Sequence, residues 1–117
     1  MTGVQTCALP IYIVRLDATD FLLATPGIYL FTFQVSVDQP GQLTLAQNAV
    51  QLAQSVVGRA TGTSQIVGTS MVTTATANNV VQVINPSSAP SALTITPNAG
   101  NFSSSPVSAH LTILRLK

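Results

Sequence analysis

The sequence predicts an all-β protein, an antiparallel β-sandwich or jelly roll. Short segments in which apolar residues alternate with Ser, Thr or Gln recur along the chain. This period of two is typical of strands with one buried face. Clusters of Pro, Gly, Asn and Ser separate the segments, as expected of turns. Only one stretch favours a helix by composition, so short strands joined by turns dominate the sequence.

The clearest strand covers residues 29–37, with the sequence YLFTFQVSV. Its apolar residues fall on one face, and Leu30 is the single apolar residue on the polar face. Residues 38–41, DQPG, form a turn, because Pro presets its backbone angle and Gly adopts positive φ freely. Alternation resumes in residues 41–47, which completes a hairpin. The residues of this strand that we expect in the core are Tyr29, Phe31, Phe33 and Val35.

Three further segments are expected to be strands before the end of the chain. Residues 65–76 are rich in β-branched side chains, and residues 80–84 are apolar on both faces, as in a central or interface strand. Residues 93–96 alternate again. Prolines, serines, asparagines and glycine predict loops over residues 85–91 and 98–106.

The last expected strand, residues 109–116, combines a core face with an unusual surface face. Leu111 and Ile113 share one face, which we expect in the core. The opposite face carries leucines where a solvent-exposed strand carries polar residues, and an exposed apolar patch usually marks a partner surface. We therefore predict a subunit interface formed by Leu30, His110, Leu114 and Leu116.

Residues 46–58, AQNAVQLAQSVVG, are compatible with two structures. Ala and Gln favour a helix, and an apolar stripe at helical spacing can be drawn through the segment. A turn at Gln47 and Asn48 followed by a short edge strand explains it equally. Because strands flank the segment, we favour the strand.

Composition excludes several functional classes. Only 6% of the residues are charged and the formal net charge is +1. The four cations are scattered, so no basic stripe is available for a nucleic acid. No run of 18 apolar residues occurs, so no membrane-spanning helix is expected. Ser and Thr supply 26 of the 117 residues, which predicts a neutral, hydroxyl-rich surface.

Residues 1–11, MTGVQTCALPI, fit nothing that follows and contain the only cysteine. They resemble the conceptual translation of a common sequencing-library adapter. We therefore expect residues 1–11 to be an artefactual tag, residues 12–117 to form one domain, and the natural N-terminal part of the protein to be missing.

Two stretches carry a family resemblance. Residues 24–37, ATPGIYLFTFQVSV, resemble the Pro-Gly-x-Tyr-x-Phe strand of trimeric jelly-roll heads. This family includes the complement globular heads, the tumour necrosis factor-like ligands and the C-terminal heads of bacterial collagen-like spore-surface proteins. Residues 108–117, SAHLTILRLK, resemble the last core strand of the bacterial members.

The resemblance implies a jelly roll of the tumour necrosis factor-like type that assembles as a homotrimer. The expected function is a non-enzymatic trimerisation and surface-display head at the C-terminus of a collagen-like or fibrous surface protein. The expected location is extracellular, on a spore (the exosporium) or a cell surface. Within the trimer, the predicted subunit interface would lie around the threefold axis.

No constellation of residues supports catalysis, a cofactor or a metal site. His110 is the only histidine and lacks an orienting carboxylate and a nucleophile elbow. Asp17 and Asp20 lie in LDATD, which predicts a turn in which Asp bonds its own backbone. With Asp38 they are the only carboxylate side chains, and isolated carboxylates are poor calcium ligands.

Two alternatives stay open. The domain could be the receptor-binding or adhesive tip of a phage or cell-surface fibre, contacting an unidentified surface ligand through the loops at residues 86–90 and 98–106. The main rival fold is a monomeric immunoglobulin-like adhesin module, which predicts a polar face at Leu114 and Leu116 that the sequence lacks.

Overall fold

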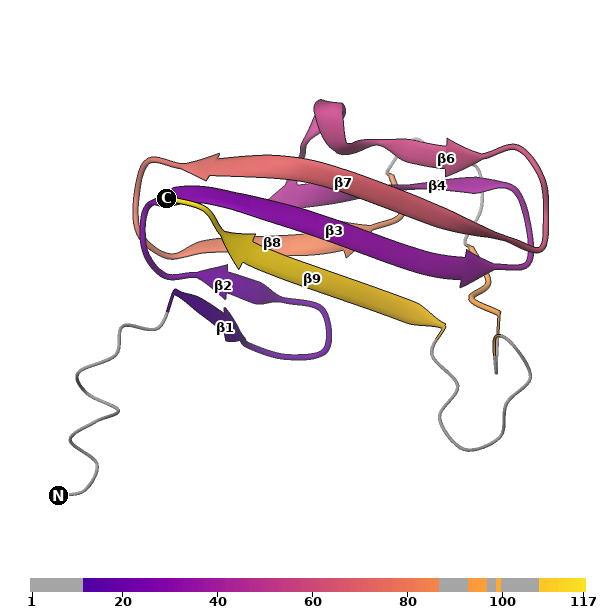
Figure 1. The fold of residues 1–117 in the computed structure, drawn as a ribbon, viewed down its shortest axis with the longest axis horizontal. Helices are drawn as coiled ribbons and strands as arrows, with labels where there is room; N and C mark the ends of the chain where they lie inside the picture. Colours follow the sequence, from indigo (N-terminus) through magenta and orange to yellow (C-terminus); the bar gives the residue numbers. More distant parts are fainter. Residues whose placement is uncertain (1–11, 87–92, 97–98, 100–107) are drawn as a thin grey trace, which may run out of the picture.

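The structure is a computed structural model that describes residues 12–86, 93–96, 99 and 108–117. These residues form nine β-strands and one short 3-10 helix, η1, arranged in antiparallel sheets (Figure 1). The prediction of an all-β antiparallel sandwich is confirmed, and no α-helix occurs in the described part of the chain.

The larger sheet contains six strands in the order β1-β2-β8-β4-β5, with β6 pairing to the first half of β4. Its central strand β8 is the apolar segment that the sequence marks as central, and it pairs with β2 on one side and β4 on the other. The bounds are β1 Ile13–Arg15, β2 Phe21–Leu23, β4 Gly41–Gln47, β5 Val50–Gln51, β6 Val57–Arg59 and β8 Asn79–Ile84.

The smaller sheet contains β7 (Ser64–Thr74), β3 (Gly27–Val37) and β9 (Ala109–Arg115), in that order. The long strand β3 lies in the middle. It pairs with β7 along its whole length and with β9 from Tyr29 to Val35. The predicted hairpin of residues 29–47 is wrong, because the chain crosses to the larger sheet after β3, and β4 pairs there with β5, β6 and β8. The C-terminal strand thus lies beside a strand that is about eighty residues earlier in the chain.

The core lies between the two sheets and is built on the inward face of β3. Tyr29, Phe31 and Phe33 are at most 1% exposed, and Val35 is 9% exposed. The Tyr29 hydroxyl donates a hydrogen bond of 2.5 Å to the Thr25 carbonyl oxygen, which satisfies the one polar atom of this buried ring. Two residues of β9, Leu111 and Ile113, pack against this core but are only partly buried.

Gly68 in β7 makes room for the ring of its partner Phe33 in β3. A Cβ atom at position 68 would lie 2.3 Å from Phe33 Cζ, far inside van der Waals contact. The aromatic core residue and the glycine opposite it are therefore a matched pair.

The ambiguous segment at residues 46–58 contains both short strands and a 3-10 turn. β5 and β6 pair with β4, and η1 (Ala53–Ser55) separates them. Ser55 is buried, and its Oγ accepts a hydrogen bond from the Leu45 N–H at 2.9 Å and donates one to the Leu52 carbonyl oxygen at 2.7 Å. These bonds draw the backbone out of the edge ladder, so the strand expectation is correct only at the two ends of the segment.

Residues 93–96 form a single β-bridge instead of the expected strand. Ile95 bridges Val37, and the Thr96 N–H donates to the Ser36 carbonyl oxygen at 2.8 Å. The segment occupies the short edge of β3 beyond the start of β9, where Ser108 bonds to the same residue Ser36. That edge is too short for a longer ladder.

The two sides of the sandwich differ. On one side β6 lies against β7, which brings the two sheets together. On the other side β9 faces β1 and β2 (Figure 1). Residues of these three strands line common hollows, and among the described residues β9 does not pair with β1 or β2.

Candidate functional site

The outward face of the smaller sheet carries an apolar row across its three strands. Leu30 in β3 pairs with Met71 in β7 and with Leu114 in β9. Paired residues of an antiparallel sheet project on the same face, so the three side chains are neighbours. Leu116 extends the row, because its N–H donates to the Ile28 carbonyl oxygen at 2.7 Å and so continues the ladder. We call Leu30, Met71, Leu114 and Leu116 the outer apolar row.

The outer apolar row is exposed to solvent in the single chain. Met71 is 58%, Leu114 54% and Leu116 50% exposed, and Leu30 is partly exposed. Burying a large apolar side chain contributes about 1.5–3 kcal/mol. A surface of this kind on a chain with so few charges is suited to association with another apolar surface.

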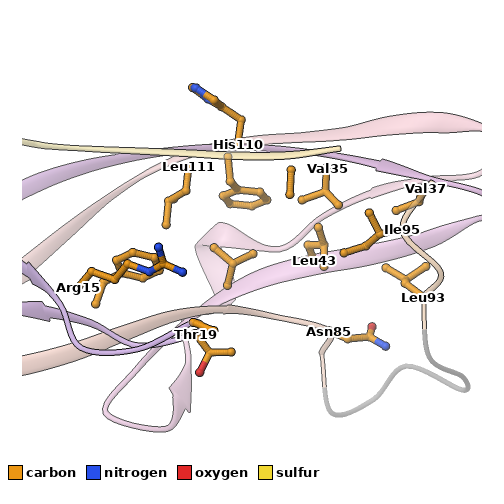
Figure 2. A pocket seen from close by; sticks show the side chains of 15 residues that line it. Arg15, Thr19, Val35, Val37, Leu43, Asn85, Leu93, Ile95, His110 and Leu111 are labelled. Carbon is orange, nitrogen blue, oxygen red and sulfur yellow. The ribbon is translucent and has the colours of Figure 1, made fainter. Parts of the chain in front are cut away.

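The structure places the predicted interface residues on this one face. His110 is exposed and pairs with Gln34, four residues along β9 from Leu114. Its side chain points away from the interior, whereas that of Leu111 points inward (Figure 2). His110 lies at the end of the face that carries Gln34, and the leucines lie at the other end.

Met71 is the member of the outer apolar row that sequence reasoning missed. The inward positions of β7 include Gly68, Ser70 and Thr74, which are small or polar, so the two faces of this strand look alike in the sequence. The sequence signal that identifies the outward face of β7 is the alternation set by Ile66 and Val72. Both side chains are buried, so Met71, at the alternate position, lies on the outward face.

A second feature is the hollow between the sheets on the side where β9 faces β1 and β2. It has a volume of about 600 Å³ and is lined mainly by apolar side chains, among them Phe21, Leu43, Val83 and Leu111 (Figure 2). An adjoining hollow of about 470 Å³ extends along β9 past Ile113. Among the described residues, Arg15 is the one ionisable residue common to both hollows, and the side chain of His110, at the rim of the larger one, points away from it.

Asp17 forms the predicted turn between β1 and β2. Its Oδ1 accepts hydrogen bonds of 2.8 Å from the backbone N–H groups of Thr19 and Asp20. These bonds favour the ionised carboxylate and hold the pKa of Asp17 below its ordinary value. The Asp20 carboxylate accepts from the Gln82 side-chain amide, so it ties the turn to β8.

The remaining chemistry-bearing groups are dispersed. Asp38 accepts a hydrogen bond of 2.9 Å from the Thr96 hydroxyl on the far end of β3. Within the described ranges, no three His, Cys, Asp or Glu side chains come together as a metal-binding group. No helix in the described residues is long and apolar enough to cross a bilayer. The predicted contact loops at residues 86–90 and 98–106 lie almost entirely outside the described residues.

A scan against protein-family models finds no match, and a search of curated proteins finds no relative. The resemblance to trimeric jelly-roll heads therefore stays a prediction based on the residues that carry it.

Proposed function

We propose that the domain is a non-enzymatic head that assembles as a homotrimer of the tumour necrosis factor-like jelly-roll type. In this proposal the outward faces of the smaller sheets of three chains pack together around a threefold axis. The observation that carries the proposal is the outer apolar row, with three side chains at least half exposed in the single chain.

The chain path supports the jelly-roll assignment. From β2 onward, successive segments alternate between the two sheets: β3, β7 and β9 belong to one, whereas β2, β4 to β6, and β8 belong to the other. Repeated crossing between two antiparallel sheets is how jelly rolls are built. An up-and-down arrangement would keep neighbouring strands in the same sheet.

Trimer assembly explains the composition of the face. The next row of paired residues on this face consists of three threonines across the same three strands, Thr32, Thr69 and Thr112. Threonine carries a methyl group as well as a hydroxyl, so it packs in an interface without introducing charge. Display of this head at the end of a collagen-like or fibrous surface protein, outside the cell or on a spore, completes the proposal.

The test compares substitutions on the two sheets of the 117-residue chain, kept under reducing conditions because of Cys7. Leu114→Glu places three carboxylates at the proposed seam and should convert a trimer into a monomer in sedimentation equilibrium. Val50→Glu is the matched control, because Val50 is 65% exposed on β5 in the other sheet. A trimer that survives Leu114→Glu with an unchanged mass contradicts the proposal.

A further inference from the structure

The outward face of the smaller sheet has one ionisable side chain. This face presents the even-numbered residues of β3 and β9 and the odd-numbered residues of β7. They are Ile, Leu, Val, Met, Thr, Ser and Gln, with a single exception, His110. The strands therefore form a face without charge, apart from a side chain of the one type that ordinarily gains its charge between pH 8 and pH 5.

The four cationic and three anionic residues of the chain lie outside these positions. Three of the seven belong to β1 and the turn that follows it, and Arg59 ends β6. Arg115 and Lys117 alternate with the outward residues of β9, and the Arg115 guanidinium stacks on the Tyr12 ring at 4.1 Å. The segments outside the described residues contain no Asp, Glu, Lys, Arg or His.

Asp38 is the carboxylate that comes nearest to this face along β3. It follows the strand, four residues beyond Gln34, the partner of His110. Four residues of extended chain span about 13 Å. This separation exceeds the screening length of about 8 Å at physiological ionic strength. The Asp38 Oδ1 also accepts a hydrogen bond of 2.9 Å from the Thr96 hydroxyl. Asp38 is therefore a poor partner for a charge on His110.

The immediate surroundings of His110 are neutral. It pairs with Gln34 of β3, which pairs in turn with Val67 of β7. A hollow beside the imidazole is lined by Gln34, Ala109 and two serines. Arg15 of β1 lines the larger hollow, from which the His110 side chain points away (Figure 2). No carboxylate is among the described residues that flank the imidazole, and the one flanking charge, that of Arg15, has the sign that opposes protonation.

An interface of ordinary size that is centred on the outer apolar row extends to His110. The histidine is four residues from Leu114 along β9, or about 13 Å. A stable interface buries about 800 Å² of each partner and includes about 20–30 residues, which is more than one row of a three-stranded sheet. Burial removes water from an imidazole and disfavours its charged form.

We propose that protonation of His110 dissociates the homotrimer in weak acid, so that the head responds to pH. This inference rests on the proposed trimer and adds the condition under which its chains separate. Assembly requires neutral imidazoles, whereas separate chains expose them to water and accept up to three protons for each trimer lost. Association is therefore strongest above the range in which histidine titrates, and it weakens as the pH falls through about 6.5.

The test measures the mass of the 117-residue chain by sedimentation equilibrium at pH 8 and pH 5, at matched ionic strength and with Cys7 kept reduced. Wild type should be trimeric at pH 8. At pH 5 the protein concentration at half-dissociation should be higher by up to about a hundredfold, the value for three ordinary histidines whose charged form the interface excludes. Far-UV circular dichroism at both pH values distinguishes dissociation from unfolding.

Two substitutions assign the effect to His110. His110→Gln keeps a polar side chain but does not titrate, so this variant should be trimeric at pH 8 and at pH 5. His110→Lys carries its charge at both pH values and should dissociate already at pH 8. Val50→Lys is the matched control for an added charge, because Val50 is 65% exposed on β5 in the other sheet. It should stay trimeric at pH 8.

The possible failures can be told apart. A wild-type chain that is monomeric at pH 8 would contradict the proposed trimer and this inference with it. A wild-type trimer that is equally stable at pH 8 and pH 5 would overturn the inference alone. Acid dissociation of His110→Gln to the same extent as wild type would overturn it too, as would a loss of β-structure at pH 5 or a His110→Lys trimer of unchanged stability.

Discussion

Leu30 of β3 and Leu114 of β9 lie directly opposite each other in the antiparallel ladder, on the outward face of the smaller sheet. Each belongs to a strand whose opposite face packs in the core. One face of these two strands thus packs in the interior of the domain, and the other face forms the proposed subunit interface. A shift of register by one residue would exchange these faces, so core packing fixes where the interface lies.

Met71 tests the part of the proposed interface that sequence reasoning missed. Met71→Ser removes an apolar side chain that is 58% exposed in the single chain, and we expect it to raise the dissociation constant of the trimer about tenfold or more. Sedimentation equilibrium over a dilution series measures this constant. Val50→Ser is the control, because Val50 is 65% exposed on β5 in the other sheet, and equal effects of the two substitutions would argue against the row.

Gly68 and Phe33 should show strong energetic coupling. Gly68→Ala places a methyl group into the Phe33 ring, which we expect to destabilise the fold by about 1–3 kcal/mol. Phe33→Leu opens space at the same point, so the double variant should lose less stability than the sum of the single variants. Urea denaturation of the four proteins gives the coupling, and simple additivity would contradict the proposed contact.

Ser55 should matter more for stability than its size suggests. Ser55→Ala leaves the Leu45 N–H without its 2.9 Å acceptor in a buried site and should cost about 1–3 kcal/mol. Ser64 is the matched control, since its buried Oγ has no hydrogen-bond partner among the described residues. Thermal denaturation should show a clear loss for Ser55→Ala and almost none for Ser64→Ala. The reverse order would contradict the described network.

Asp17 gives the β1–β2 turn a pH dependence with a defined sign. Its pKa is lower in the folded chain than the ordinary value of 3.8, because the Thr19 and Asp20 N–H groups bond to the carboxylate. Its stabilising contribution is therefore complete above about pH 3.8 and is lost as the pH falls through the lower folded-state pKa. Asp17→Asn keeps an acceptor oxygen but does not titrate. The stability difference between wild type and Asp17→Asn should shrink in acid, and melting curves that stay parallel from pH 6 to pH 2 would contradict this assignment.

The sequence predicts most reliably those elements whose alternation is uninterrupted. β3 is recognisable because aromatic and β-branched residues occupy every inward position, and the turn after it carries Pro and Gly. β9 is recognisable because Leu111 and Ile113 alternate with the residues of its other face, whose leucines are the basis of the proposed interface. Both predictions rest on the local period of two, which the chain itself carries.

Other features depend on contacts that local patterns do not encode. The inward face of β7 is weakly marked in the sequence because it includes Gly68, Ser70 and Thr74, and the contact between Gly68 and Phe33 depends on the pairing of β7 with β3. The segment around Ser55 leaves the ladder because of hydrogen bonds to buried groups of β4, which outweigh both helix and strand propensity. The position of β9 beside β3 is a property of strand order, which arises from pairing between segments far apart in the chain.

The most direct test of the proposed homotrimer is the mass of the 117-residue chain in solution, measured by light scattering after size exclusion. The chain has a mass of 12.1 kDa. We predict a single species with the mass of three chains that persists on dilution into the micromolar range. A species with the mass of one chain at every concentration would contradict the trimer and leave the outer apolar row without its proposed partner.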